Sequence, residues 1–260
     1  MSAAVPPYPP GRGLLQGKAV IVTAAAGTGI GFAAARRCVE EGAQVVLSDV
    51  HARRLGEAAE RLEALGGEKP HAVLCDVTVE ADVQRLFAEA IAAAGRVDVV
   101  INNAGLGGTA SLVDMTDEQW ARVLDVTLNG TFRCTRAALR HMMERRSGAI
   151  VNNASVLGWR AQAGQAHYAA AKAGVMALTR CAAVEAAPAG VRVNAVAPSL
   201  AMHPFLAKVT SPALLEELTA RQAFGRAAEP WEVANVMVFL ASDYAGYMTG
   251  EVVSVSAQHP

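Results

Sequence analysis

The 260-residue chain has few aromatic residues, few cysteines and almost no excess of charge of either sign. Its formal net charge is −1, and charged residues make up 18% of it. Proteins that bind nucleic acid or a membrane surface by electrostatics usually carry a basic excess, so we expect neither partner. No uninterrupted apolar run is long enough to cross a bilayer, and the Pro-rich residues 1–12 lack the apolar core of a secretory signal.

Cysteine is scarce and widely spaced. The four residues are Cys38, Cys75, Cys134 and Cys181, and no two of them form a CxxC pair. This spacing argues against a zinc site, a redox pair or a disulfide framework. We expect buried, reduced thiols, a cytoplasmic location and no metal site.

What the sequence does contain is a regular alternation of short β-branched runs with longer helical periods. Strands are expected at 19–23, 44–49, 71–76, 97–102, 148–155, 191–198 and 251–256. A first helix is expected to follow the glycine-rich turn and to end at 41, and further helices are expected at 52–65, 79–94, 117–145, 165–187 and 231–242. Continuously apolar strands are typical of parallel sheets covered on both faces. We predict one α/β domain at 13–260, a Rossmann-like doubly wound parallel sheet of about seven strands flanked by helices, after an extended arm at 1–12.

A glycine-rich turn follows the first predicted strand. Gly27, Thr28, Gly29 and Ile30 lead directly into the next helix. In doubly wound sheets, ligands bind beyond the carboxyl ends of the strands. Glycines there let the backbone approach a pyrophosphate, which then lies at the amino end of the helix. The turn therefore predicts a dinucleotide site, although a plain glycine-rich turn is the simpler alternative.

Asp49 ends the second predicted strand, 18 residues after Gly31. A carboxylate there can accept both ribose hydroxyls of an adenosine. It would also repel the 2′-phosphate of NADP, because unit charges ~4 Å apart interact by about 4 kcal/mol at an effective dielectric near 20. We therefore expect NAD. The alternative is a solvated turn aspartate, with Arg53 or Arg54 binding a phosphate.

Two further strand ends carry candidate cofactor contacts. Asp76 and Val77 follow the third strand, where they could meet the adenine, and a helix-capping role for Asp76 is an equal alternative. Asn103, Ala104 and Gly105 follow the fourth strand. Small residues there would let the chain pass beneath the ribose and nicotinamide.

The chemistry-bearing residues lie in the second half. Ser155 ends the fifth strand, and Tyr168 and Lys172 follow it by 13 and 17 residues. The i,i+4 spacing places the phenol and the ammonium on one helical face. Tyrosine has a pKa of about 10. To act as a base near pH 7, its phenolate must be stabilised by roughly 4 kcal/mol relative to the phenol. Lys172 supplies this only in a cleft shielded from water. Ser155 would then orient the substrate oxygen.

With these motifs in place, the sequence resembles the short-chain dehydrogenase/reductase family from about Gly13 to Ser256. The matching pieces are VTAAAGTGIG, Asp49, CDVT, NNAG, NNAS, YAAAK and VNAVAPS. The resemblance implies that Ser155, Tyr168 and Lys172 are catalytic and that Tyr168 and Lys172 also contact the cofactor. It further implies that Pro198 and Ser199 line the nicotinamide and that a substrate lid lies near 199–226.

A narrower resemblance rests on NNASVLGWRAQ, AFGRAAEPWEV and GEVVSVSAQHP. These segments look like dehydrogenases of bacterial sterol ring-C/D degradation, which act on hydroxy-hexahydroindanone propanoyl-CoA type thioesters. The resemblance implies a cyclic hydroxy-acyl-CoA substrate. The family resemblance implies a homotetramer, and the long helices with more than one apolar face indicate subunit packing.

The chain departs from the family pattern at several positions, two of which bear on the proposed site. Ala24 replaces the first glycine of the phosphate loop. Thr127 stands where the family has a fourth catalytic residue, an asparagine, and is expected to hold a water instead. Asn129 is two residues further, about 200° around a regular helix, and cannot substitute.

Several residues near the site have two interpretations. We expect a surface or packing role for His167, since adjacent helical residues point about 100° apart. Trp159, Gln162 and Gln165 either touch substrate or pack the loop. For Met202, His203 and Phe205, a lid over an apolar substrate and a surface helix are equal alternatives.

The sequence as a whole predicts an NAD(H)-dependent oxidoreductase that interconverts a secondary alcohol and a ketone, with Tyr168 as general acid and base. One alternative is an NADPH-dependent 3-oxoacyl thioester reductase, which Asp49 opposes. A second is a non-catalytic dinucleotide sensor, which the intact Ser155, Tyr168 and Lys172 set opposes.

Overall fold

The structure is a computed structural model that describes residues 3–65, 68–203, 206 and 211–257. One seven-stranded sheet runs through it in the order β3-β2-β1-β4-β5-β6-β7, and all neighbouring strands are parallel. The strands are β1 (Ala19–Thr23), β2 (Gln44–Asp49), β3 (His71–Leu74), β4 (Val99–Asn102), β5 (Gly148–Asn153), β6 (Val191–Pro198) and β7 (Val252–Val255). The predicted fold is confirmed, with four strands slightly shorter than their patterns.

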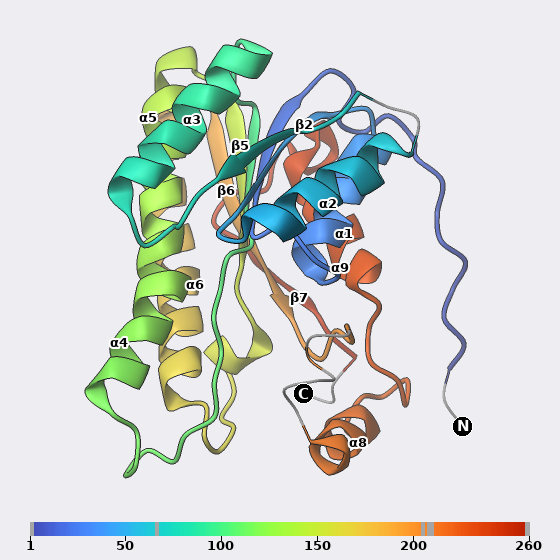
Figure 1. Ribbon diagram of the computed structural model, residues 1–260, viewed down its shortest axis with the longest axis vertical. Coiled ribbons are helices and arrows are strands. Elements are labelled where there is room, and N and C mark those ends of the chain that lie inside the picture. The colour runs from blue at the N-terminus through green and yellow to red at the C-terminus, as the bar shows by residue number, and fades with distance from the viewer. Residues whose placement is uncertain (1–2, 66–67, 204–205, 207–210, 258–260) are drawn as a thin grey trace.

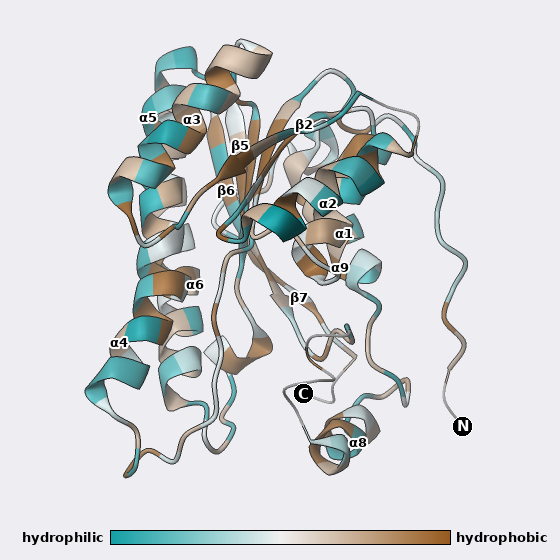
Figure 2. Ribbon diagram, viewed as in Figure 1, coloured by the Kyte–Doolittle hydropathy of each residue, from teal (hydrophilic) through white to brown (hydrophobic). Residues whose placement is uncertain are grey.

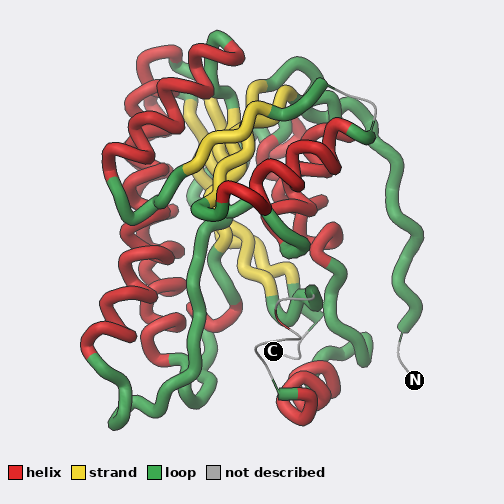
Figure 3. The backbone as a smooth tube through the Cα atoms, viewed as in Figure 1, coloured by secondary structure: helices red, strands yellow, loops and turns green. Residues whose placement is uncertain are grey.

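Helices cover both faces of the sheet (Figures 1 and 3). One face carries α1 (Ile30–Glu40), α2 (Ala52–Glu63) and α9 (Pro230–Ala241), and the other carries α3 (Glu80–Ala94), α5 (Gly130–Arg145) and α6 (Ala166–Ala186). Alternate residues of one strand enter opposite cores: Val20 and Val22 pack on the first side and Ile21 on the second. This is why most strand residues are apolar whichever face they point to, and the strands are largely brown in Figure 2.

The predicted regular helix at 117–145 is interrupted. It consists of α4 (Asp117–Leu124), a π-helical turn η1 (Asp125–Asn129) and α5. In the π turn, the Gly130 N–H donates to the Asp125 carbonyl, five residues earlier, in place of the usual four. The prediction of one uniform helix was therefore wrong at this point. The turn lies at Thr127, which is completely buried.

The N-terminal arm is bound to the domain. The Tyr8 hydroxyl donates to Glu40 Oε2 at 2.5 Å, and its ring lies 5.3 Å from the Trp231 ring, between centroids. Further along, the buried Glu41 carboxylate accepts from the backbone N–H groups of Arg12 and Leu14. The arm thus joins α1 to α9 and continues toward α8 (Pro212–Ala220) (Figure 1).

The remaining elements are the short 3₁₀ turns η2 (Val156–Gly158), η3 (Ala187–Ala189) and η4 (Asp243–Ala245). Within the described ranges, no helix has both the length and the apolar character needed to cross a membrane. Cys38, Cys75 and Cys134 are free and buried, as expected. Cys181 is free but exposed, so the expectation of burial was wrong there, because this position lies on the outer side of α6.

Candidate active site

The glycine-rich loop between β1 and α1 turns through two left-handed residues. Ala24 has φ of 50° and Gly27 has φ of 115°. A left-handed conformation costs a residue with a Cβ roughly 1–2 kcal/mol, so Ala24 is strained where the resembled family has glycine. Helix α1 begins after Gly29, which has no side chain with which to cap it. The first N–H groups of α1 therefore suit an anion such as a pyrophosphate.

Asn103 fixes this loop from the end of β4. Its Nδ2 donates to the carbonyls of Thr23 at 3.2 Å and Ala24 at 3.1 Å. Gly31 passes close beneath, since a Cβ on it would stand 2.2 Å from the Ala24 carbonyl oxygen. Ala104 continues the same contact, donating its backbone N–H to the Thr23 hydroxyl. The loop is thus held in shape by direct bonds from the neighbouring strand.

Asp49 lies at the end of β2, beside the loop, and is buried. Its Oδ2 accepts from the Ala26 N–H at 3.2 Å and its Oδ1 from the His51 N–H at 3.0 Å. Burial raises the pKa of this carboxyl group, and hydrogen bonds from the backbone of Ala26 and Val50 oppose that rise. Each oxygen has lone-pair capacity beyond the single bond it accepts, so the residue suits a partner with hydroxyl donors.

The arginines near Asp49 differ in what they contact. Arg53 is exposed and forms an ion pair with Glu57, one turn along α2. Arg54 acts on Asp49 through its charge, which opposes the rise that burial causes in the pKa of that carboxyl. Sequence reasoning missed Arg61, whose Nη1 donates to the Gly27 carbonyl at 2.9 Å. No local motif marks Arg61, because the contact joins positions 34 residues apart.

Asp76 and Val77 have structural roles at the end of β3. Asp76 Oδ1 accepts from the backbone N–H and the hydroxyl of Thr78, at 2.9 and 2.7 Å. These bonds close a turn before α3, and the helix-capping alternative was wrong, because Val79 is the N-cap residue of α3. The Val77 side chain is buried against Gly130, where an added Cβ would come within 2.6 Å of it. Adenine contacts from this segment stay a prediction, and Val77 could supply them only through its backbone.

The three predicted catalytic residues come together near the carboxyl ends of β4 and β5. The Ser155 side chain lies beside Tyr168, close enough to influence the pKa of its phenol. The Lys172 Nζ lies 5.5 Å from the centroid of the Tyr168 ring and donates to the Asn153 carbonyl at 2.5 Å. It also lies 3.4 Å from the point where a Cβ on Gly105 would stand. A side chain at position 105 would crowd the Lys172 ammonium. The absence of a side chain at Gly105 therefore leaves room for Lys172.

Burial dominates the electrostatics of this group. It raises the pKa of Tyr168 to about 12, with the Ser155 side chain acting in the opposite direction. It lowers the pKa of Lys172 to about 8, because the ammonium is almost completely removed from water. The phenol is therefore protonated near neutral pH in the chain by itself. A base at this position needs further positive charge beside it.

The Thr127 hydroxyl is bonded to the backbone of Leu106. Its hydroxyl donates to the Leu106 carbonyl at 3.1 Å and accepts from the Leu106 N–H at 3.0 Å. A hydroxyl has one donor and two acceptor positions, so a water could only donate to it. Thr127 ties the π turn to the segment after β4. Asn129 is directed elsewhere and donates to Asp125 Oδ1.

The segment after β6 is connected to the predicted lid. Pro198 is the last residue of β6 and is buried. The Ser199 hydroxyl donates to Gln222 Oε1 at 3.0 Å, and the Met202 N–H donates to the Ala228 carbonyl at 2.9 Å. The His203 ring faces the glycine loop, with ring atoms 3.8 Å from where a Cβ on Gly29 would stand. Phe205, the other lid candidate, lies outside the described residues.

The residues of the loop between Ser155 and Tyr168 differ in how far their side chains are exposed to solvent. Trp159 is half exposed, Gln162 is partly buried, and Gln165 bonds across to Gly108 and Thr109. His167 is buried, in agreement with a packing role.

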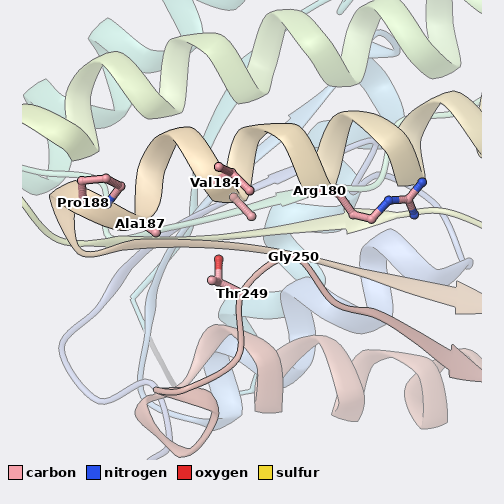
Figure 4. Close-up of a pocket in the computed structure, with 7 residues that line it drawn as sticks. Arg180, Val184, Ala187, Pro188, Thr249 and Gly250 are labelled. Carbon is pink, nitrogen blue, oxygen red and sulfur yellow. The ribbon is translucent and has the colours of Figure 1, made fainter.

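The surface hollow in Figure 4 lies elsewhere on α6. It is lined by Arg180, Ala183, Val184, Ala187, Pro188, Thr249 and Gly250. Val184 is sixteen residues beyond Tyr168, about 24 Å along a helix. The hollow is therefore separate from the residues that carry the chemistry.

Comparison with known proteins gives consistent relatives. A protein-family model described as enoyl-(acyl carrier protein) reductase matches residues 24–257. The chain is 63% identical over 251 residues to the (5R,7aS)-5-hydroxy-7a-methyl-1-oxo-2,3,5,6,7,7a-hexahydro-1H-indene-carboxyl-CoA reductase of Mycobacterium tuberculosis, covering 96% of both chains. It is 43% identical over 237 residues to the cis-4-hydroxycyclohexanecarboxylate dehydrogenase of Sinomonas cyclohexanicum, covering 91% of this chain and 94% of that one.

A solved structure gives the same result. The crystal structure of a short chain dehydrogenase from Mycobacterium smegmatis matches with a TM-score of 0.88 and 57% identity, over 99% of each chain. Each of these relatives spans nearly the whole chain, so the similarity includes the glycine loop, the strand ends and the segment from Ser155 to Lys172.

Proposed function

Because the chain belongs to the short-chain dehydrogenase/reductase family of oxidoreductases, whose members bind a nicotinamide dinucleotide, we propose that it interconverts a secondary alcohol and a ketone with NAD(H). The observation that carries this proposal is the meeting of Ser155, Tyr168 and Lys172 on elements that follow the carboxyl end of β5. In the sheet order, β1 and β4 are the neighbours at which the direction of winding reverses. Such a switch point is where dinucleotides bind.

The residues of the chain fit this cofactor. The uncapped start of α1 suits the pyrophosphate, and Asp49 suits the adenosine ribose. Lys172 and Gly105 adjoin the place expected for the nicotinamide ribose. The cofactor, when bound, supplies or accepts the hydride.

The protein residues handle the proton. Tyr168, protonated near neutral pH, donates its proton to a ketone oxygen in the direction of reduction. In the direction of oxidation the phenol must lose its proton first, which requires positive charge near it. Lys172 provides part of that charge from within 5.5 Å of the ring centroid. The Ser155 hydroxyl, which lies beside Tyr168, orients the substrate oxygen between them.

We propose NAD as the physiological cofactor because Asp49 is buried close to the loop, and a buried carboxylate repels a 2′-phosphate. The test compares kcat/KM with NAD and with NADP for the wild type and for Asp49→Ser. We expect the wild type to prefer NAD by more than tenfold, and the variant to lose most of that preference. A wild type that turns over faster with NADP would refute this assignment.

For the substrate we propose a hydroxylated or oxidised ring compound carried as a CoA thioester, of the kind formed in sterol degradation. The support is the 63% identity to a reductase of a hydroxy-methyl-oxo-hexahydroindene carboxyl-CoA. The segment 199–226, tied to β6 through Ser199 and Gln222, would serve as the lid over it. We also propose a cytoplasmic homotetramer, since α6 leaves Val184 77% exposed on its outer side. Light scattering after size-exclusion chromatography tests that assembly.

The deciding experiment is the Tyr168→Phe variant, assayed with NAD(H) against cyclic hydroxy-acyl-CoA, hydroxysteroid and 3-oxoacyl thioester compounds. We expect the wild type to turn over at least one member and Tyr168→Phe to lose activity by more than a hundredfold. Tyr247→Phe is the matched control, because Tyr247 is fully exposed. Equal near-zero rates for wild type and Tyr168→Phe across the panel would favour a dinucleotide sensor instead.

A further inference from the structure

His167, the residue before Tyr168, is one of the largest side chains in the fully buried part of the described structure. Only 2% of its surface is exposed. A buried imidazole is polar and costs free energy unless its nitrogens have partners. Its surroundings therefore indicate what the side chain contributes.

One partner is the backbone of Tyr168 itself. Tyr168 is the third residue of α6, so its N–H belongs to the first turn, which has no intrahelical acceptor. The residue before the helix, Gln165, does not cap it with its side chain. The Tyr168 N–H instead donates to Nδ1 of His167 at 2.9 Å. An imidazole thus satisfies the donor that an N-cap side chain would normally satisfy.

The same ring borders the segment that follows β4. Nε2 lies 3.3 Å from the point where a Cβ on Gly108 would stand. The neighbouring Gly107 lies against the phenol ring, whose Cδ2 is 3.8 Å from the corresponding Cβ position. The ring of His167 and the ring of Tyr168 thus contact consecutive glycines.

Two further contacts join this segment to the start of α6. Gln165 Nε2 donates to the Gly108 carbonyl at 2.8 Å and to the Thr109 hydroxyl at 3.2 Å. The Ala110 N–H donates to the Gly164 carbonyl at 3.1 Å. Residues 107–110, which we call the glycine segment, are therefore held along residues 164–168 by hydrogen bonds and close packing.

We propose that His167, with Gln165, is a positioning residue for Tyr168. Nδ1 of His167 fixes the backbone from which the phenol extends, and the imidazole and the Gln165 amide hold the glycine segment against the phenol ring. The phenol thereby keeps the orientation in which it meets Ser155. This inference rests on the proposed role of Tyr168 as the proton donor and acceptor.

The test compares His167→Phe, which keeps a ring but loses the acceptor, with His167→Asn, whose Oδ1 can accept near the position of Nδ1. His141→Phe is the matched control. His141 Nε2 also accepts a backbone N–H, that of Val97 before β4, at the end of the sheet away from Tyr168. The measurements are kcat, KM for the cofactor, and hydrogen–deuterium exchange of the cofactor-free chain over 105–110 and 163–170.

For His167→Phe we expect kcat to fall roughly ten- to a hundredfold, the scale of a small misplacement of a reacting group, with KM for the cofactor changed less than about twofold. Exchange over both peptides should become faster. His167→Asn should recover most of kcat, and His141→Phe should change neither property. If His167→Phe matches His141→Phe in kcat and in exchange at these peptides, the side chain only fills space and the proposal is overturned.

A His167→Phe chain that fails to fold leaves the second half of the contact to be tested. Gln165→Met removes both side-chain hydrogen bonds to the glycine segment. These bonds lie at the protein surface, so this variant should fold more readily than His167→Phe. We expect faster exchange at 105–110 and a lower kcat, and no change in either would overturn the proposal. If Tyr168→Phe kept wild-type activity, the proposed function would fail, whereas the exchange data would still report on the contacts of His167.

Discussion

Replacing Lys172 by methionine should make the protein more stable at neutral pH, although it should remove activity. Burial lowers the pKa of Lys172 from 10.5 to about 8. A change of this size corresponds to roughly 3 to 4 kcal/mol of cost to the folded state when the amine is protonated in both states. The hydrogen bond from Nζ to the Asn153 carbonyl is lost in the variant, and a bond of this kind contributes about 1.5 kcal/mol. We therefore expect a net gain near 2 kcal/mol at pH 7.

The pH dependence gives this prediction a second, independent signature. The unfolded chain binds the lysine proton more tightly than the folded chain, so wild-type stability rises with pH between about 8 and 10.5. The cost is complete below this window and disappears above it. By pH 9.5 roughly 2 kcal/mol of it is gone, so the advantage of Lys172→Met should have largely vanished.

The assay is urea unfolding followed by circular dichroism at pH 7 and pH 9.5, with reductant and at one fixed protein concentration. Lys18→Met is the matched control, because Lys18 pairs with the exposed Asp243 and should change stability by less than about 0.5 kcal/mol at both pH values. A Lys172→Met variant less stable than the wild type at pH 7, or a difference that is the same at both pH values, would refute the reasoning.

Three further predictions concern the loop and the π turn. Gly31→Ala should destabilise the chain by more than about 2 kcal/mol and weaken NAD binding in titration calorimetry, because its Cβ would meet the Ala24 carbonyl at 2.2 Å; normal binding would mean that the loop adapts. Ala24→Gly should raise the free energy of unfolding in urea by up to about 1 kcal/mol, since it relieves a left-handed alanine at φ of 50°. A lower free energy of unfolding would show that Ala24 is not strained. Thr127→Val should cost about 1–3 kcal/mol in the same assay, because both backbone groups of Leu106 lose their hydroxyl partner; a neutral result would mean that these groups find other partners.

The sheet was predictable because its evidence is local. Each strand is a short apolar run, and residues such as Val20 and Ile21 need only be apolar on both sides to enter opposite cores. Ser155, Tyr168 and Lys172 were predictable as a set for a related reason. A strand end and an i,i+4 pair on the next helix fix their relative placement through local geometry.

What the sequence could not predict depends on contacts between distant positions. The hydroxyl of Thr127 bonds to Leu106, 21 residues earlier, and nothing in the DVTLN segment marks it as a π turn. Tyr8 bonds to Glu40, 32 residues later, so the arm shows no sign in sequence of being bound. Nδ1 of His167 accepts a hydrogen bond from the Tyr168 backbone N–H. This bond depends on the side-chain rotamer, which residue spacing does not predict.

The π turn at Asp125–Asn129 also determines how this part of the chain can change in length. A π turn takes one residue more than an α turn to close its hydrogen bond, so it behaves as a single-residue insertion absorbed into a helix. Deleting one residue there would restore α geometry and leave the downstream residues facing as they do now, whereas the same residues wound as a regular α-helix would rotate everything downstream by about 100°. Cys134, Ala138 and Met142, now in the core, would turn away from it. The five residues of the π turn thus determine which side of α5 faces the core.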